Sequence, residues 1–196
     1  MGRIVAVNFV SIDGVLQAPL SAEEDRDGGF TAGGWAAAAG HDTVDAVMRK
    51  LTTSAAGMLL GRRTYDIFTE AWSQADAADP SIAAMNRMPK YVVTRNTDRL
   101  AWANSRRLGG DQASGVREVR ESTEGRLVVF GSGQLVQALA KNDLINEYTL
   151  LQYPIVLASG KRLFGVDRHR TDFILSGSLI SPAGVAILTY QRSVNS

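Results

Sequence analysis

Short apolar runs that alternate with helical periodicity limit the possible folds of this chain more than any other feature. Each run is rich in β-branched or aliphatic residues and is typical of a buried strand. The runs are Ile4–Val10, Met58–Leu60, Tyr91–Thr94 and Leu127–Phe130. Helices are predicted from Asp42, from Asp79-Pro80 to about Met88, and through Leu135 to Ala140. This alternation predicts a parallel sheet covered by helices on both faces.

The last third of the chain has a different pattern. Glu147–Tyr153 is expected to form a further strand. Thr171–Ile180 and Gly184–Arg192 flank Ser181-Pro182-Ala183, which predicts an antiparallel hairpin. The predicted class is therefore a three-layer α/β/α fold with a mixed, mostly parallel sheet and a C-terminal antiparallel hairpin. Residues 1–196 contain no internal repeat or linker, so we expect a single domain.

Two segments lack clear periodicity. Residues 17–40 contain Pro19, an acidic patch from Glu23 to Asp27 and five glycines, which predicts a long mobile surface loop. Residues 104–125 are polar and contain glycine, and only a brief strand near Val116–Val119 is expected there.

Composition excludes several classes of function. The net charge is only +1, so no overall field favours nucleic acid or a membrane surface. Cysteine is absent, and His41 and His169 are too few for an ordinary metal cluster, so no metal is expected. No apolar stretch suits a secretory signal or approaches the roughly 18 residues of a membrane span, which predicts a cytoplasmic protein. Chemistry must come from carboxylates, hydroxyls, backbone groups or a bound cofactor.

Residues suited to anions follow three of the predicted strands. They are Gly131-Ser132-Gly133 before a helix, Gly61-Arg62-Arg63-Thr64, and Thr94-Arg95. Helix N-termini, arginine forks and hydroxyls all donate hydrogen bonds to phosphate oxygens. Together they predict one extended ligand with several phosphates, such as a dinucleotide. A simple chain reversal at the glycines and solvated arginines are the alternatives. Val136 stands where the common dinucleotide fingerprint needs glycine or alanine, which disfavours the ordinary dinucleotide fold.

Four motifs in this order resemble a known family. They are V-S-I-D-G, G-R-R-T-Y, P-K-Y-V-V-T-R and V-V-F-G-S-G-Q-L-V, after or across the successive strands. Their arrangement resembles the dihydrofolate reductase fold. It is most similar to stand-alone relatives of the C-terminal reductase domain of the bacterial riboflavin-biosynthesis deaminase-reductase. The resemblance covers roughly residues 3–192.

The resemblance implies NADPH as the hydride donor and a homodimer formed through the C-terminal hairpin or an exposed sheet edge. It places the adenosine end and 2'-phosphate near Gly61, Arg62, Arg63, Thr64, Thr94 and Arg95. It places the pyrophosphate on Gly131, Ser132, Gly133, Gln134, Leu135 and Val136. It places the nicotinamide near Asn8, Phe9, Leu16 and Gln17, opposite Phe130.

Roles for the carboxylates and aromatic residues follow less directly. Asp42, with Asp45 close by, is the candidate proton donor, and a helix N-cap or first-turn charge is the alternative. Asp13 is interpreted as a turn residue, with substrate contact as the alternative. The candidate walls of a planar substrate pocket, which could equally belong to the core, are Trp35, Tyr65, Phe68 and Trp72.

The predicted function is an NADPH-dependent reductase that transfers hydride to a small planar heterocycle. The substrate would resemble that of 5-amino-6-(5-phosphoribosylamino)uracil reductase or of dihydrofolate reductase. A non-catalytic nucleotide-binding or sensing protein and a flavin-binding reductase that uses the same cleft are the alternatives. The expected partner is a small molecule, with no nucleic acid and no membrane.

Overall fold

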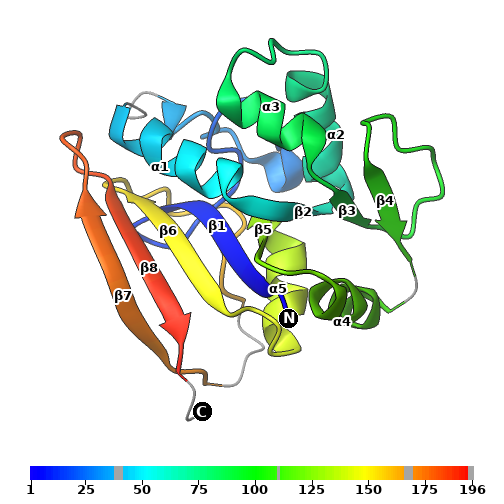
Figure 1. Cartoon of the computed structure of the whole chain (residues 1–196). Coiled ribbons are helices and arrows are strands. Elements are labelled where there is room, and N and C mark those ends of the chain that lie inside the picture. The colour runs from blue at the N-terminus through cyan, green and yellow to red at the C-terminus, as the bar shows by residue number, and fades with distance from the viewer. Residues whose placement is uncertain (38–41, 110, 166–169, 194–196) are drawn as a thin grey trace.

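In the residues that the structure describes, eight strands form one sheet (Figure 1). The structure is a computed structural model that describes residues 1–37, 42–109, 111–165 and 170–193. In their order across the sheet, the strands are β4 Ser105–Leu108, β3 Lys90–Val93, β2 Ala55–Gly61, β5 Arg126–Phe130, β1 Arg3–Ser11, β6 Glu147–Tyr153, β8 Ala186–Arg192 and β7 Phe173–Ile180.

The direction of the strands confirms the predicted mixed sheet. Strand β1 pairs in parallel with β5 and with β6, and the strands from β4 to β6 are all parallel to their neighbours. Strand β8 is antiparallel to both β6 and β7, so the predicted hairpin forms one end of the sheet. The carboxyl ends of the parallel strands therefore meet along one edge.

Helices cover both faces of the sheet, as predicted for three layers (Figure 1). The helices are α1 Asp42–Thr53, α2 Arg62–Trp72, α3 Pro80–Arg87, α4 Gln112–Ser122 and α5 Gly133–Lys141. Neighbouring residues of β1 point to opposite faces because side chains alternate along a strand. Ile4 lies in the core beneath α4 and α5, whereas Val5 lies in the core beneath α1, α2 and α3.

Local signals account for the ends of α3. The Asp79 carboxylate accepts hydrogen bonds from the backbone N–H groups of Ser81 at 2.7 Å and Ile82 at 3.3 Å. Pro80 occupies the first helical position, where its missing N–H has no intrahelical partner to lose. This confirms the predicted N-cap.

The expected strand at Val116–Val119 is wrong, because these residues lie in α4. Val116 and Val119 are both buried and three residues apart, so they share one face of the helix. The Asp111 carboxylate caps the helix by accepting from the N–H groups of Ala113 and Ser114, both at 3.3 Å. Strand β4 lies in the same polar region and is not among the predicted elements; neither is α2.

The irregular segment between 17 and 37 has turns and one short 3-10 helix, η1 Asp27–Gly29, while 38–40 lie outside the described residues. Most of its described residues are exposed or half-buried, as expected for a surface loop, but a few buried side chains anchor it. Phe30 and Ala18 form a small core with Val15, and the Trp35 indole donates to the Gln17 carbonyl at 2.8 Å. Among the described residues, no helix is long and apolar enough to cross a membrane.

Candidate functional site

A cleft of about 510 Å³ lies at the carboxyl ends of β1, β2 and β5. Open α/β sheets place their ligands at this edge, and the volume lies in the range of small-molecule sites. Most of the residues predicted to contact a cofactor line it: Asn8, Phe9, Leu16, Gln17, Gly61, Arg62, Arg63, Thr64, Gly131, Ser132, Gly133, Gln134 and Leu135.

Two helix N-termini meet in the cleft. Helix α2 follows Gly61 directly, α5 follows Ser132 directly, and neither helix has a side-chain cap. The Ser132 hydroxyl instead accepts a hydrogen bond from the Gly61 N–H at 3.1 Å, which joins the two helix starts. The first N–H groups of both helices and both positive dipole ends are therefore directed at one place. This arrangement suits an anion with two charged groups.

The backbone before α5 is unusual. Gly131 and Ser132 are consecutive residues in the left-handed region, with φ of 55° and 46°. A side chain at position 133 would crowd the cleft, because a Cβ there would lie 3.0 Å from both methyl groups of Leu16. The glycines thus let Leu16 and the turn approach each other closely at the start of α5.

Arg62 lines the cleft and has an unused donor. Its Nε donates to both oxygens of Asp66 at 2.9 Å, and this pair raises the pKa of Arg62. Its Nη1 is buried and has no hydrogen-bond partner among the described residues. A buried unpaired donor is costly, so this group is available to a ligand oxygen.

Asn8 has an unused acceptor. Its side chain lies in the middle of β1, is 1% exposed and lines the cleft. The amide nitrogen donates to the Gly131 carbonyl at 2.8 Å, which fixes the orientation of the amide. The amide oxygen is buried without a partner among the described residues, so it can accept from a ligand N–H.

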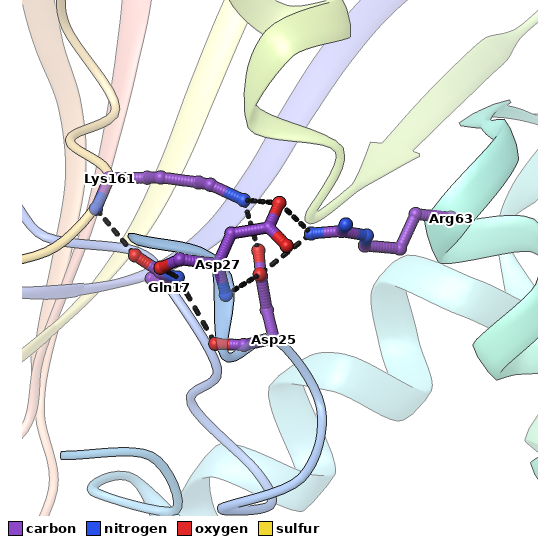
Figure 2. Close-up of polar contacts among 5 residues, drawn as sticks. All are labelled: Gln17, Asp25, Asp27, Arg63 and Lys161. Atoms are coloured by element: carbon purple, nitrogen blue, oxygen red, sulfur yellow. Dashed lines mark hydrogen bonds and ion pairs between the residues drawn. The ribbon is translucent and has the colours of Figure 1, made fainter. Parts of the chain in front are cut away.

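Arg63, unlike Arg62, pairs with two carboxylates from another segment, both through Nη1. Its guanidinium contacts the carboxylates of Asp25 at 2.6 Å and Asp27 at 2.7 Å, and the Lys161 ammonium contacts the same two carboxylates at 2.7 Å (Figure 2). We call these four residues the charge cluster. Hydrogen bonds from Arg63 and then Lys161 hold the pKa of Asp27 far below its usual value.

Several predicted cofactor residues do not line the cleft. Val136 and Phe130 are buried in the two cores. The Thr94 hydroxyl accepts from the Asn96 N–H at 3.0 Å, and Arg95 is exposed. The third predicted strand end therefore lies outside the cleft lining, because β3 is two strands away from β5 in the sheet.

Among the four aromatic residues proposed as pocket walls, Phe68 lines the cleft, and its ring lies 6.3 Å from that of Phe130. Tyr65 is 1% exposed, and its hydroxyl accepts from the Trp102 N–H at 2.8 Å. Trp35 meets the Tyr153 ring edge-on, and Trp72 packs against the core under α1 to α3. These three side chains belong to the packing of the protein.

The predicted carboxylates also lie away from the cleft. Asp42 and Asp45 are exposed on the first turn of α1, beside Arg49. Asp13 stabilises the turn after β1, because it accepts from the Ser11 hydroxyl at 2.7 Å and from the N–H groups of Leu157 and Ala158. The Ser11 hydrogen bond, followed by that of Leu157, lowers the pKa of Asp13 to about 2.

Five charged residues that line the cleft are absent from the predicted site: Glu24, Asp25, Asp27, Lys161 and Arg162. The acidic patch was visible in the sequence, but no local pattern connects it to positions 161 and 162. Burial raises the pKa of Glu24, and its carboxylate accepts from the Leu20 N–H at 3.0 Å. Among the described residues, no cluster of histidines and carboxylates is arranged to hold a metal ion.

The fold and the position of the cleft define an α/β protein with a mixed sheet and a cleft at the carboxyl ends of its parallel strands. More specifically, the chain belongs to the family described as the RibD C-terminal domain, whose model matches residues 3–185.

Solved structures share this fold. One is a candidate riboflavin biosynthesis protein from Shewanella sp. PV-4, with a TM-score of 0.71, 18% identity, and coverage of 97% of this chain and 99% of that one. Another is a pyrimidine reductase-like protein from Corynebacterium diphtheriae, with a TM-score of 0.63, 11% identity, and coverage of 98% and 92%. No curated protein matches the chain in sequence.

Proposed function

We propose that this protein is an NADPH-dependent reductase that acts on a small planar heterocycle. The observation that supports this most strongly is the pair of uncapped helix N-termini joined by Ser132 and Gly61, in a cleft that Arg62 also lines. Such a site suits the two phosphates of a dinucleotide. Membership of the RibD C-terminal domain family and the likeness to a pyrimidine reductase-like fold support the same class.

The residues present fit the proposed cofactor. The N–H groups at the starts of α2 and α5, with Arg62, would hold the phosphates. The free oxygen of Asn8 would accept from the carboxamide N–H of the nicotinamide, since it is a buried acceptor without a partner among the described residues. When bound, the nicotinamide supplies the hydride.

A proton must accompany the hydride if a C=N or C=C bond is reduced. Glu24 is better placed for this role than Asp42, because Glu24 lines the cleft and Asp42 lies outside its lining. Burial keeps the pKa of Glu24 above its usual value, which favours a protonated carboxyl group at higher pH. Phe68 offers an apolar wall for a flat ring.

Titration of the purified protein with NADPH and NADH, followed by tryptophan fluorescence, tests the cofactor. We expect tighter binding of NADPH. Arg62→Ala should weaken NADPH binding about ten- to a hundredfold, because it removes a charged contact. The matched control is Arg106→Ala, which removes an exposed arginine on β4 outside the cleft lining and should leave binding unchanged. Equal affinity for the two cofactors would contradict the 2'-phosphate assignment.

Catalysis needs a separate measurement, because the same cleft would serve a non-catalytic nucleotide-binding protein. NADPH oxidation is followed with dihydrofolate, the riboflavin-pathway pyrimidine and a panel of imines and quinones. Oxidation with one of them supports the reductase. Tight NADPH binding with no oxidation across the panel would favour a sensing protein, and tight flavin binding without NADPH binding would favour a flavoprotein.

A further inference from the structure

The charge cluster joins three segments that lie far apart in the sequence. Asp25 and Asp27 belong to the irregular segment after β1, Arg63 to the first turn of α2, and Lys161 to the loop after β6 (Figure 2). All four residues line the cleft. The cluster therefore closes one side of the proposed ligand site with protein carboxylates.

The buried amide of Gln17 fixes the backbone beneath this cluster. Its nitrogen donates to the carbonyls of Asp25 at 3.1 Å and Asp27 at 3.0 Å, and its oxygen accepts from the Lys161 N–H at 2.9 Å. The side chain is only 2% exposed. Both amide hydrogens are used, so Gln17 has no donor left for a ligand.

The two carboxylates remain ionised near neutral pH. Burial alone would raise the pKa of Asp25, but hydrogen bonds from Lys161 and the Asp27 N–H, with the nearby cations, lower it. The lowered pKa of Asp27 has Arg63 and Lys161 as its main causes. Two negative charges therefore balance the two positive charges of Arg63 and Lys161.

The carboxylate oxygens occupy the positions that phosphate oxygens would take on these two cations. Arginine and lysine bind both kinds of anion with the same donors and at similar distances. A phosphate that approached Arg63 would meet two carboxylates already within 2.7 Å of its guanidinium. Repulsion between these like charges opposes binding of the phosphate, although water screens it at Asp27, whose side chain is half exposed. Nη1 of Arg63 and the Lys161 ammonium can bind a phosphate in place of the carboxylates only if Asp25 and Asp27 move away.

We propose that Arg63 and Lys161 form a second phosphate site in the cleft, and that Asp25 and Asp27 mask it as an internal anion. A ligand phosphate that binds there displaces the carboxylates of Asp25 and Asp27 from the two cations. Arg62 also pairs with a carboxylate, that of Asp66, but only through Nε; its Nη1 has no partner among the described residues, so a ligand phosphate can bind there without displacing a carboxylate. The inference rests on the proposed phosphate-binding cleft, but it does not require that the protein reduces a substrate.

The first test removes the internal charges without changing side-chain size. Pyrophosphate binding to Asp25→Asn/Asp27→Asn is compared with the wild type by calorimetry. We expect binding at least about tenfold tighter in the double variant, because the competing carboxylates are gone. Glu118→Gln/Glu121→Gln is the matched control: it removes two exposed carboxylates on α4, outside the cleft lining, and should leave the affinity nearly unchanged. Adding Lys161→Met to the cleft variant should abolish the gain.

The second test uses the unaltered protein. Hydrogen exchange of residues 20–30 should become faster when pyrophosphate or NADPH binds, because the segment loses its contacts with both cations. Unchanged or slower exchange in the presence of bound ligand would contradict the inference, as would unchanged or weaker pyrophosphate binding by the double variant. If that variant does not fold, Asp27→Asn alone serves, since Asp27 is half exposed, and it must still bind more tightly. A wild type that binds no NADPH contradicts the proposed function instead.

Discussion

Asn8 and Gln17 both place a buried side-chain amide at the cleft, but they differ in which hydrogen-bonding groups are left without a partner among the described residues. Asn8 uses its nitrogen on Gly131 and leaves its oxygen free, whereas Gln17 uses both hydrogens on the acidic segment. Both residues were predicted to contact the nicotinamide. The structure retains a free hydrogen-bonding group for that role at Asn8 and makes Gln17 a support of the charge cluster.

Lys90 is a buried cation outside the cleft. Its ammonium donates to the carbonyls of Met85 at 2.6 Å and Met88 at 2.9 Å, and it lies 4.6 Å from the centre of a Trp102 ring. The side chain therefore satisfies carbonyls at the end of α3, where helical partners are missing. Burial lowers the pKa of Lys90 to about 8.

This shift predicts a pH dependence of stability. Between about pH 8 and pH 10.5 the unfolded chain holds the Lys90 proton while the folded chain has lost it. The contribution of Lys90 to the free energy of unfolding therefore rises with pH in this window. Urea denaturation of the wild type and Lys90→Met across the window should show a difference that shifts in favour of the wild type as pH increases. If the difference in free energy of unfolding between the two proteins did not change with pH, the pKa of Lys90 would not be lowered in the folded state, because the carbonyls would keep the ammonium charged.

At the scale of elements, the starts of α2 and α5 shape the cleft. Helix α2 begins directly after β2 and α5 begins two residues after β5, and both lack side-chain caps, so their N–H groups remain open to a ligand. Gly133 and Leu16 are in tight contact beside one of these starts. Substitution of Gly133 by a slightly larger residue should therefore affect ligand binding more than the stability of α5.

Gly133→Ala tests this contact. The added methyl group would meet Leu16 at 3.0 Å, so Leu16 must move and the cleft at α5 changes shape. We expect NADPH affinity, measured by fluorescence, to fall roughly three- to tenfold, on the order of 1 kcal/mol.

The matched control is Gly115→Ala on α4. Its added methyl would contact Leu108 at an ordinary 3.5 Å. Alanine favours helix over glycine by about 0.5–1 kcal/mol, so this variant should unfold at a higher temperature and bind NADPH normally. Equal effects of the two variants on NADPH affinity would show that the contact with Leu16 is unimportant.

At the scale of the whole molecule, β7 is an exposed edge strand. Ile174 and Ile180 are each 61% exposed, Leu175 is 51% exposed and Leu179 is 47% exposed. The strand has no charged residue, although charges are a common protection of edges. We propose that β7 pairs with its counterpart in a second copy of the chain, as the resemblance to the family implies. A two-fold dimer would pair both edges at once.

Leu175→Lys/Leu179→Lys tests this interface by placing charges on the edge. Light scattering after gel filtration should give a dimer for the wild type and a monomer for the variant, which should keep its fold. The control is Val156→Lys, which replaces an exposed apolar residue, 62% exposed, outside β7 and should remain dimeric. A monomeric wild type, or a variant that stays dimeric, would contradict the proposed interface.

Local patterns in the sequence determined the class of fold and the main part of the cleft. The short apolar runs became β1, β2, β3 and β5, and the turns after β2 and β5, which were predicted to contact a cofactor, line the cleft. These features depend on neighbours in sequence, such as side-chain alternation and glycine turns. The same reasoning assigned Val116–Val119 to a strand and missed α4, because two valines three positions apart in a polar region were not recognised as one face of a helix.

Only the tertiary structure decided which charged groups are free. Arg62 and Arg63 are adjacent in the sequence, yet Nη1 of Arg62 has no partner among the described residues while Arg63 binds two carboxylates from another segment. Lys161 meets Asp25 across 136 positions of the chain, a distance that no periodicity or capping rule spans. The physical reason is that pairing between loops depends on how the sheet brings their ends together, and sequence neighbours do not determine that arrangement.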